Sequence, residues 1–262
     1  MGETAMATHE ITMCLFRRAA PRLVCGFCLL AQPLSAASDS TNTPDVPAIV
    51  QRYYYAVGGY DRILSTRTLR MRGTYREGTF QASTIMERER PNLRVVSVGG
   101  FCEGYDGAAW EQDPRTGKVT RTHGAASIAS RHGAEFDESL VNAAAKGTKL
   151  TVLGASVIGG HKTWKVLATL SDGWRKDYYI DKSTGLIVAL IVSMPIHARG
   201  KPVTSISYYE DYRRVDDLLF PFRQVERNER TGKVMNVLQW TSVVANPTVA
   251  PTAFSPPCKV RP

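Results

Sequence analysis

The amino-acid sequence predicts a mainly β protein, built as an antiparallel meander that follows one N-terminal helix. Apolar and polar residues alternate with a period of two over many short runs, as they do in half-buried strands. Short turns that contain glycine separate these runs, and neighbouring strands joined so tightly must be antiparallel. Two segments depart from this rhythm and have the spacing or composition of helices.

The first 37 residues have the three-part organisation of a secretory signal peptide. Residues 17–22 contain three arginines, an apolar run extends from Leu23 to Ala31, and small residues follow at Ser35–Ala37. The apolar run is too short for a membrane-spanning helix, which requires about 20 residues. We therefore expect residues 1–37 to be a signal peptide cleaved near Ala37, with Met13 as a candidate translation start.

This interpretation places residues 38–262 in the periplasm as a single domain. Hydrophobic residues make up 43% of the chain and charged residues 22%, which is the balance of a globular protein. The formal net charge of +9 suits either a solvated surface or attraction to anionic headgroups and acidic proteins. Nucleic acid is not expected as a partner, because the chain carries an export signal and no basic run with interleaved aromatic residues.

The predicted domain begins with a helix. Apolar residues from Val46 to Val57 recur at the i, i+3, i+4 and i+7 spacing of one helical face, and Gly58-Gly59 provides the C-terminal end. Residues 60–65 add one further helical turn. A second helical segment is expected at 125–131 and 136–146, which are rich in Ala, Glu and Leu. It either packs against the outside of the sheet or covers its concave face.

Strand-like runs follow the first helix. They cover residues 68–75, 80–86, 93–98, 108–112, a run around Val152, 165–170, 174–180, 186–192, 203–210, 222–229 and 234–244. Thr-Gly pairs at 116–117, 184–185 and 231–232 predict hairpin turns between such runs. The full phosphate-binding pattern Gly-x4-Gly-Lys-Ser/Thr is absent, so these pairs do not indicate a nucleotide site.

The residues that could carry catalysis are scattered along the chain. The histidines beyond the presequence, His123, His132, His161 and His197, have no metal-ligand spacing, so we expect no metal site, no catalytic residues and no cofactor. An enzyme on this scaffold would require His161 or His197 to converge with carboxylates in a cleft. Two cysteines, Cys102 and Cys258, remain after export, and an even count permits one disulfide between them.

A set of short sequence motifs stands in a fixed order between residues 49 and 256. They are Tyr55-x-x-Gly58-Gly59-x-Asp61-x-Ile63, Gly73, Arg90-Pro91-Asn92-x-Arg94, Tyr105-Asp106-Gly107-x-x-Trp110, Ile158-Gly159-Gly160, Trp164-Lys165-Val166, Tyr178-Tyr179-Ile180-Asp181-x-x-Thr184-Gly185-Leu186, Asp211-Tyr212-Arg213-x-Val215, Phe220-Pro221 and Ala253-Phe254. In order and spacing the chain resembles the outer-membrane lipoprotein-sorting proteins of the LolA/LolB-like superfamily. The resemblance implies an open, strongly curved antiparallel sheet, a half-barrel, with helices as a lid over an apolar cavity for acyl chains.

The function that this resemblance implies is a periplasmic carrier or chaperone that shields the acyl chains of lipoproteins or lipids. Its partners would be acylated protein or lipid, with an envelope membrane protein as a further candidate. The first alternative is an envelope-stress sensor of the same fold, and the second is an enzyme on a β scaffold. Alternation along the predicted strands gives six candidate ligand-binding residues on one face of the sheet: Leu69, Met71, Tyr75, Trp110, Val166 and Tyr179.

Overall fold

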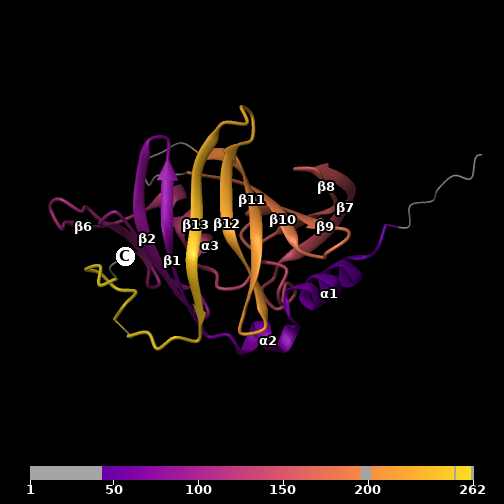
Figure 1. The fold of residues 1–262 in the computed structure, drawn as a ribbon, viewed down its shortest axis with the longest axis horizontal. Helices are drawn as coiled ribbons and strands as arrows, with labels where there is room; N and C mark the ends of the chain where they lie inside the picture. Colours follow the sequence, from indigo (N-terminus) through magenta and orange to yellow (C-terminus); the bar gives the residue numbers. More distant parts are fainter. Residues whose placement is uncertain (1–42, 196–201, 251, 261–262) are drawn as a thin grey trace, which may run out of the picture. The chain divides into compact units, whose positions relative to one another are not determined.

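An open sheet of thirteen antiparallel strands makes up most of the described residues, which are 43–195, 202–250 and 252–260 of this computed structural model (Figure 1). The predicted signal peptide lies outside these residues. The strand order is β6-β5-β4-β3-β2-β1-β13-β12-β11-β10-β9-β8-β7. The sheet is therefore two meanders, joined where the first strand pairs with the last and Leu69 lies opposite Ala245. The predicted mainly β, antiparallel, open fold is confirmed.

The strands have the following bounds: β1 Thr68–Glu77, β2 Phe80–Glu89, β3 Leu93–Val98, β4 Phe101–Tyr105, β5 Ala109–Gln112, β6 Val119–Arg121, β7 Lys149–Ile158, β8 His161–Thr169, β9 Arg175–Asp181, β10 Ile187–Pro195, β11 Pro202–Val215, β12 Leu218–Asn228 and β13 Val234–Ala245. The three predicted Thr-Gly turns lie between strands, and each glycine has a positive φ: 67° at Gly117, 79° at Gly185 and 68° at Gly232. Left-handed backbone of this kind favours glycine, as the sequence predicted.

Two strands escaped the sequence-based prediction. Strand β6 has only three residues, and β4 contains a charged residue on a face that is otherwise apolar. This residue, Glu103, is opposite Val96 in the register, and its carboxylate accepts a hydrogen bond from Arg94 on β3 at 2.9 Å. Because a cross-strand partner compensates the charge, the strand forms without the polar–apolar alternation that would have revealed it.

Helix α1 (Val46–Val57) begins at Asp45, whose side chain accepts a hydrogen bond from the N–H of Ala48 at 2.9 Å. It ends at Gly58, where φ is 123° and a Cβ would lie only 2.2 Å from the carbonyl oxygen of Asp217. Only glycine therefore fits between the helix and the turn before β12. The short helix α2 (Tyr60–Ser65) follows, so both helical segments expected at the start of the domain are confirmed.

Helix α3 (Gly124–Ala134) lies against the inner face of the sheet, a term we use for the face that also carries α1 (Figure 1). It contacts β4 and β5 on one side and β10 on the other, although six strands separate β4 from β10 in the sheet order. Both contacts are possible only because the sheet curves around the helix. The predicted half-barrel is confirmed, and the helical segment covers the concave face rather than the outside.

Residues 136–146, which we call the turn segment, form turns instead of a helix. The predicted second part of the helical segment is therefore wrong. Tertiary hydrogen bonds engage backbone groups that a helix would need: Tyr54 Oη donates to the carbonyl of Leu140 at 3.1 Å, and the N–H of Ser139 donates to Tyr178 Oη at 3.1 Å. Asn142 adopts a left-handed φ of 53°, which breaks any helix there. The apolar residues Leu140 and Val141 are nevertheless buried in the core beneath α1.

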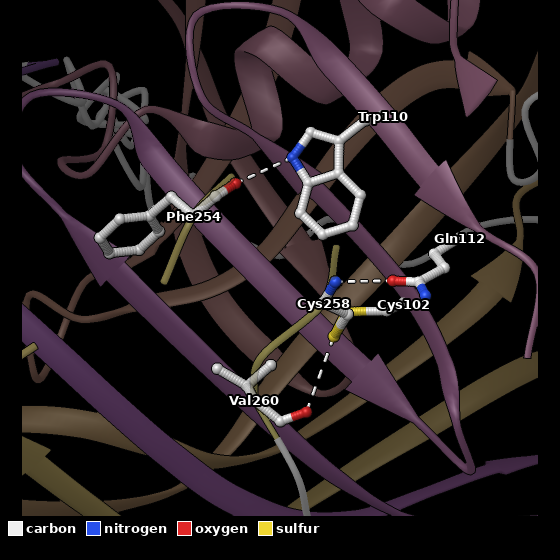
Figure 2. Close-up of a disulfide and its surroundings, with 6 residues drawn as sticks. All are labelled: Cys102, Trp110, Gln112, Phe254, Cys258 and Val260. Atoms are coloured by element: carbon white, nitrogen blue, oxygen red, sulfur yellow. Dashed lines mark hydrogen bonds between the residues drawn. A yellow bond between two sulfur atoms is a disulfide. The ribbon is translucent and has the colours of Figure 1, made fainter. Parts of the chain in front are cut away.

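The C-terminal residues 252–260 pack against the outer face of β2–β5 (Figure 2). The structure joins Cys102 on β4 to Cys258 through a disulfide, across 156 residues of sequence. The indole N–H of Trp110 donates to the carbonyl of Phe254 at 2.8 Å, and the N–H of Cys258 donates to Gln112 Oε1 at 2.6 Å. This segment thus closes an apolar cluster on the side of the sheet away from α1 and α3.

Candidate functional site

A cavity of about 800 Å³ lies between the inner face of the sheet and the helices. Most of its walls are apolar side chains from the strands, the helices and the turn after α3. They include Leu69, Met71, Tyr75, Met86, Val96, Val98, Leu190, Val192, Leu238 and Trp240 from the sheet, Tyr53 and Val57 from α1, Ala126 and Ala129 from α3, and Phe136 and Val141 from the turn segment. Its volume is in the range of pockets that bury a small-molecule ligand.

Four of the six predicted ligand-binding residues, Leu69, Met71, Tyr75 and Trp110, line this cavity, the first three from β1. The pairing of Met71 with Met86 and of Tyr75 with Leu238 places them among other cavity residues on neighbouring strands. The alternation along β1 therefore located one wall of the cavity.

Trp110 on β5 also lines the cavity, as predicted, but its ring is anchored on the other face of the sheet from the β1 residues. It pairs with Gly104, which is opposite Val95 in the cluster beneath the C-terminal segment. The indole ring covers Gly104, where a Cβ would lie 2.5 Å from the ring, and it bonds to Phe254 on the outer face. Which face of the sheet a given β5 side chain occupies, relative to β1, depends on the turns between the two strands. The sequence does not specify this.

Val166 and Tyr179 lie outside the cavity for two different reasons. Val166 is on the inner face, opposite Tyr178, but it is fully buried in the cluster beneath α1. Tyr179 pairs with Lys165 and is on the outer face, where it packs with Ala189. Of these two adjacent tyrosines, Tyr178 faces inward, and it was not among the residues predicted from the sequence.

The polar part of the cavity lining is acidic, although the chain as a whole is basic. Of the described residues, three Lys or Arg side chains line it, Arg88, Arg94 and Lys176, against seven carboxylates: Glu77, Glu103, Glu111, Glu135, Asp137, Glu138 and Glu226. Several of these carboxylates have partners. Glu138 accepts from Tyr178 Oη at 3.0 Å, and Asp137 is in a bidentate ion pair with Arg90. Burial, and then the charge of Glu138, raise the pKa of Tyr178, so its hydroxyl stays a donor.

The C-terminal end of α3 is fixed to the turn between β8 and β9 by His132. Its ring bridges two carboxylates, with Nδ1 3.1 Å from Glu135 Oε1 and Nε2 2.9 Å from Asp172 Oδ2, and it lies 4.9 Å from the Trp174 ring. Lys176 Nζ lies 3.5 Å from the other oxygen of Glu135. Although burial raises the pKa of Glu135, the hydrogen bond from His132 and the charge of Lys176 together lower it below its usual range.

A second pocket of about 770 Å³ adjoins the cavity and shares His132, Glu135 and Asp137 with it. Its walls are mainly charged, and the ions are largely paired within the protein. Arg90, for example, donates to the carbonyl of Thr66 at 2.5 Å as well as to Asp137. This network holds the turn segment against the start of β1 and closes that end of the cavity.

The catalytic alternative required His161 or His197 to meet carboxylates in a cleft. His161 Nδ1 lies 2.9 Å from Asp181 Oδ2, but neither residue lines either pocket. His197 lies outside the described residues. Among the residues that the structure describes, no group of three or more His, Cys, Asp and Glu side chains is arranged to hold a metal ion. None of the described helices is long and apolar enough to span a bilayer.

Comparisons with known proteins reveal the fold alone. No protein-family model matches the chain, and no curated protein matches it. Among solved structures, a DUF1329 family protein from Desulfovibrio piger is 12% identical, with a TM-score of 0.57 over 81% of this chain and 98% of that one. A LolA superfamily protein from Nitrosomonas europaea is 11% identical, with a TM-score of 0.53 over 81% and 98%.

An outer membrane lipoprotein-sorting protein domain from Vibrio parahaemolyticus is similar as well. It is 12% identical, with a TM-score of 0.50 over 80% of this chain and 97% of that one. The matches extend over nearly the whole length of each of the three structures, so the similarity is to a complete domain. The chain has a LolA-like fold, as the ordered motifs in its sequence predicted.

Proposed function

We propose that this protein is a periplasmic carrier or chaperone that shields the acyl chains of a lipid or an acylated protein. The observation that carries the proposal is the cavity of about 800 Å³, walled mainly by apolar side chains, between a LolA-like sheet and its helices. An acyl chain gains roughly 0.8 kcal/mol for each CH₂ removed from water. A space of this size and lining therefore offers a strong driving force for an aliphatic ligand and requires no chemical step.

The direct test is titration of the purified domain with a fluorescent fatty acid and with a diacylated peptide. Met71 lies on the central strand β1, is 9% exposed, and lines the cavity. Replacing Met71 by Glu places a carboxylate on the apolar wall, and burying a charge without a partner is costly. We expect Met71→Glu to weaken acyl-chain binding by about 1 kcal/mol or more, roughly fivefold or more in Kd.

A matched control comes from the opposite face of the neighbouring strand. Val244 on β13 pairs with Arg70, away from the cavity, and is 44% exposed. Val244→Glu introduces the same charge close to β1 but outside the cavity, so binding should stay at the wild-type level. Absence of saturable binding to the wild-type protein, or equal weakening by both variants, would contradict the carrier function.

A periplasmic location is part of the proposal. It is supported by the signal-peptide pattern of residues 1–37 and by the Cys102–Cys258 disulfide, since such bonds persist in oxidising compartments. N-terminal sequencing of the exported protein should give Ser38 or a residue within a few positions of it. An exported form that retains Leu23 to Ala31 would show that the segment is not cleaved.

A further inference from the structure

One carboxylate of the cavity lining has an oxygen without a partner. Glu226, on β12, is 7% exposed and lines the cavity next to Gln224. Its Oε2 accepts a hydrogen bond from Asn236 Nδ2 at 2.6 Å across the β12–β13 pair, whereas its Oε1 is buried and has no hydrogen-bond partner among the residues that the structure describes. Two polar side chains of the same lining are already engaged with other groups: Gln224 donates to Ser207 at 3.2 Å, and Tyr75 donates to Glu77 at 2.7 Å.

This arrangement is unfavourable in the empty protein. A buried carboxylate oxygen that accepts no hydrogen bond costs more free energy than a neutral acceptor left in the same situation. The other Glu residue with comparable burial, Glu87 at 5% exposure, is on the outer face and has an ion pair with Arg70 at 2.6 Å. Within the described part of the chain, Glu226 has no ion pair of this kind, and the described cavity lining contains more carboxylates than Lys and Arg side chains.

A ligand that enters the cavity can supply the missing donor. Its apolar chain would lie along the wall formed by Leu190, Leu238 and Met71, and a donor group attached to that chain would reach the inner side of β12. A hydrogen bond to a carboxylate is about twice as strong as one between neutral groups. The carboxylates of the lining repel an anionic ligand. A ligand with a nitrogen donor therefore fits better than a free fatty acid or a phosphate.

We propose that Glu226 is the polar recognition residue of the cavity and that it binds an N–H group of an amphiphile, such as the amide of an N-acylated amine. This inference rests on the proposed carrier function and deepens it, because it specifies the headgroup chemistry. The ligand class is an aliphatic chain with an amide or ammonium N–H close to its polar end.

The test compares two ligands that differ at one atom. N-ethylpalmitamide carries an N–H where ethyl palmitate carries an ester oxygen, and the two share chain length and shape. We expect the wild-type protein to bind the amide on the order of tenfold more tightly than the ester. The Glu226→Leu variant should bind the amide and the ester with about equal affinity. Glu226→Gln retains a neutral acceptor, so its preference for the amide should be intermediate.

Using the ratio of the two affinities within each variant cancels any general change in the cavity, including the loss of the partner of Asn236. Glu87→Gln, a buried Glu variant on the outer face, should keep the wild-type ratio. Equal binding of amide and ester by the wild type overturns the role of Glu226 while leaving the carrier function intact. Failure of both ligands to bind saturably contradicts the carrier function itself, so the two outcomes are distinguishable. A preference for the amide that survives Glu226→Leu assigns the donor to another residue and also overturns the inference.

Discussion

Tyr178 and Tyr179 are adjacent on β9 and serve opposite faces of the sheet. Tyr178 is fully buried on the inner face, where its hydroxyl donates to Glu138 and accepts from the N–H of Ser139. Tyr179 is on the outer face, with Lys165 Nζ 5.4 Å from the centre of its ring. Both residues are large, aromatic and hydroxylated, so composition alone does not distinguish them. Only the pairing register of β8 and β9 specifies which one faces the core.

Removing the Tyr178 hydroxyl should destabilise the fold. Tyr178→Phe leaves the N–H of Ser139 without its acceptor and deprives Glu138 of a donor, and hydrogen bonds to charged groups contribute about 1.5–3 kcal/mol. We expect the free energy of unfolding in urea to fall by about 2 kcal/mol. Tyr55→Phe, at a tyrosine of α1 that is 87% exposed, is the control and should be neutral. A neutral Tyr178→Phe variant would show that water replaces these contacts without loss.

Helix α3 depends on contacts at its C-terminal end more than on its own sequence. It has no side-chain hydrogen bond at its N-cap, and two of its eleven residues, Gly124 and Gly133, are helix-weakening glycines. His132, Glu135 and Asp172 fix its last turn to the β8–β9 connection, with Arg131 paired to Asp172 and Lys176 to Glu135. His132 and Asp172 are 40 residues apart in the sequence, so their contact is a product of the tertiary fold.

The same contacts predict acid sensitivity. The pKa of Glu135 is lowered in the folded protein, so its ionised form stabilises the fold above the unfolded-state pKa of about 4.3, and this contribution is lost as the pH falls through the folded-state value. We expect the free energy of unfolding to decrease from about pH 5 towards pH 3. Glu135→Gln should flatten this dependence, whereas the exposed Glu229→Gln should not. Parallel pH profiles for wild type and Glu135→Gln would contradict this assignment.

At the scale of the whole molecule, the two faces of the sheet are covered by different parts of the chain. Helices α1 and α3 with the turn segment cover the inner face and leave a cavity, whereas residues 252–260 pack on the outer face against Ile85, Val95 and Trp110. The disulfide lies on this outer side, within the same apolar cluster (Figure 2).

Stability and ligand binding should therefore respond separately to loss of the disulfide. In the chain-entropy description, a cross-link that spans 156 residues stabilises the fold by about 5 kcal/mol, and measured values are often lower. Replacing Cys102 and Cys258 together by Ala should lower the free energy of unfolding by about 3–5 kcal/mol. Fatty-acid affinity, measured at a temperature where the variant is folded, should be unchanged. A variant that is fully stable but does not bind would place the C-terminal segment in the binding function.

The sequence by itself determined the features that depend on local chemistry. The spacing of apolar residues in 46–57, the glycines at the hairpin turns and the two-residue period of β1 specify helix, turn and strand within a few neighbours. The order of short motifs along the chain identified the LolA-like fold. What only the tertiary structure decided are relations between distant residues. The faces of Trp110 and Tyr179, the turns at 136–146 and the unpartnered oxygen of Glu226 depend on register, curvature and cross-strand contacts, and a sequence read in one dimension contains no measure of these.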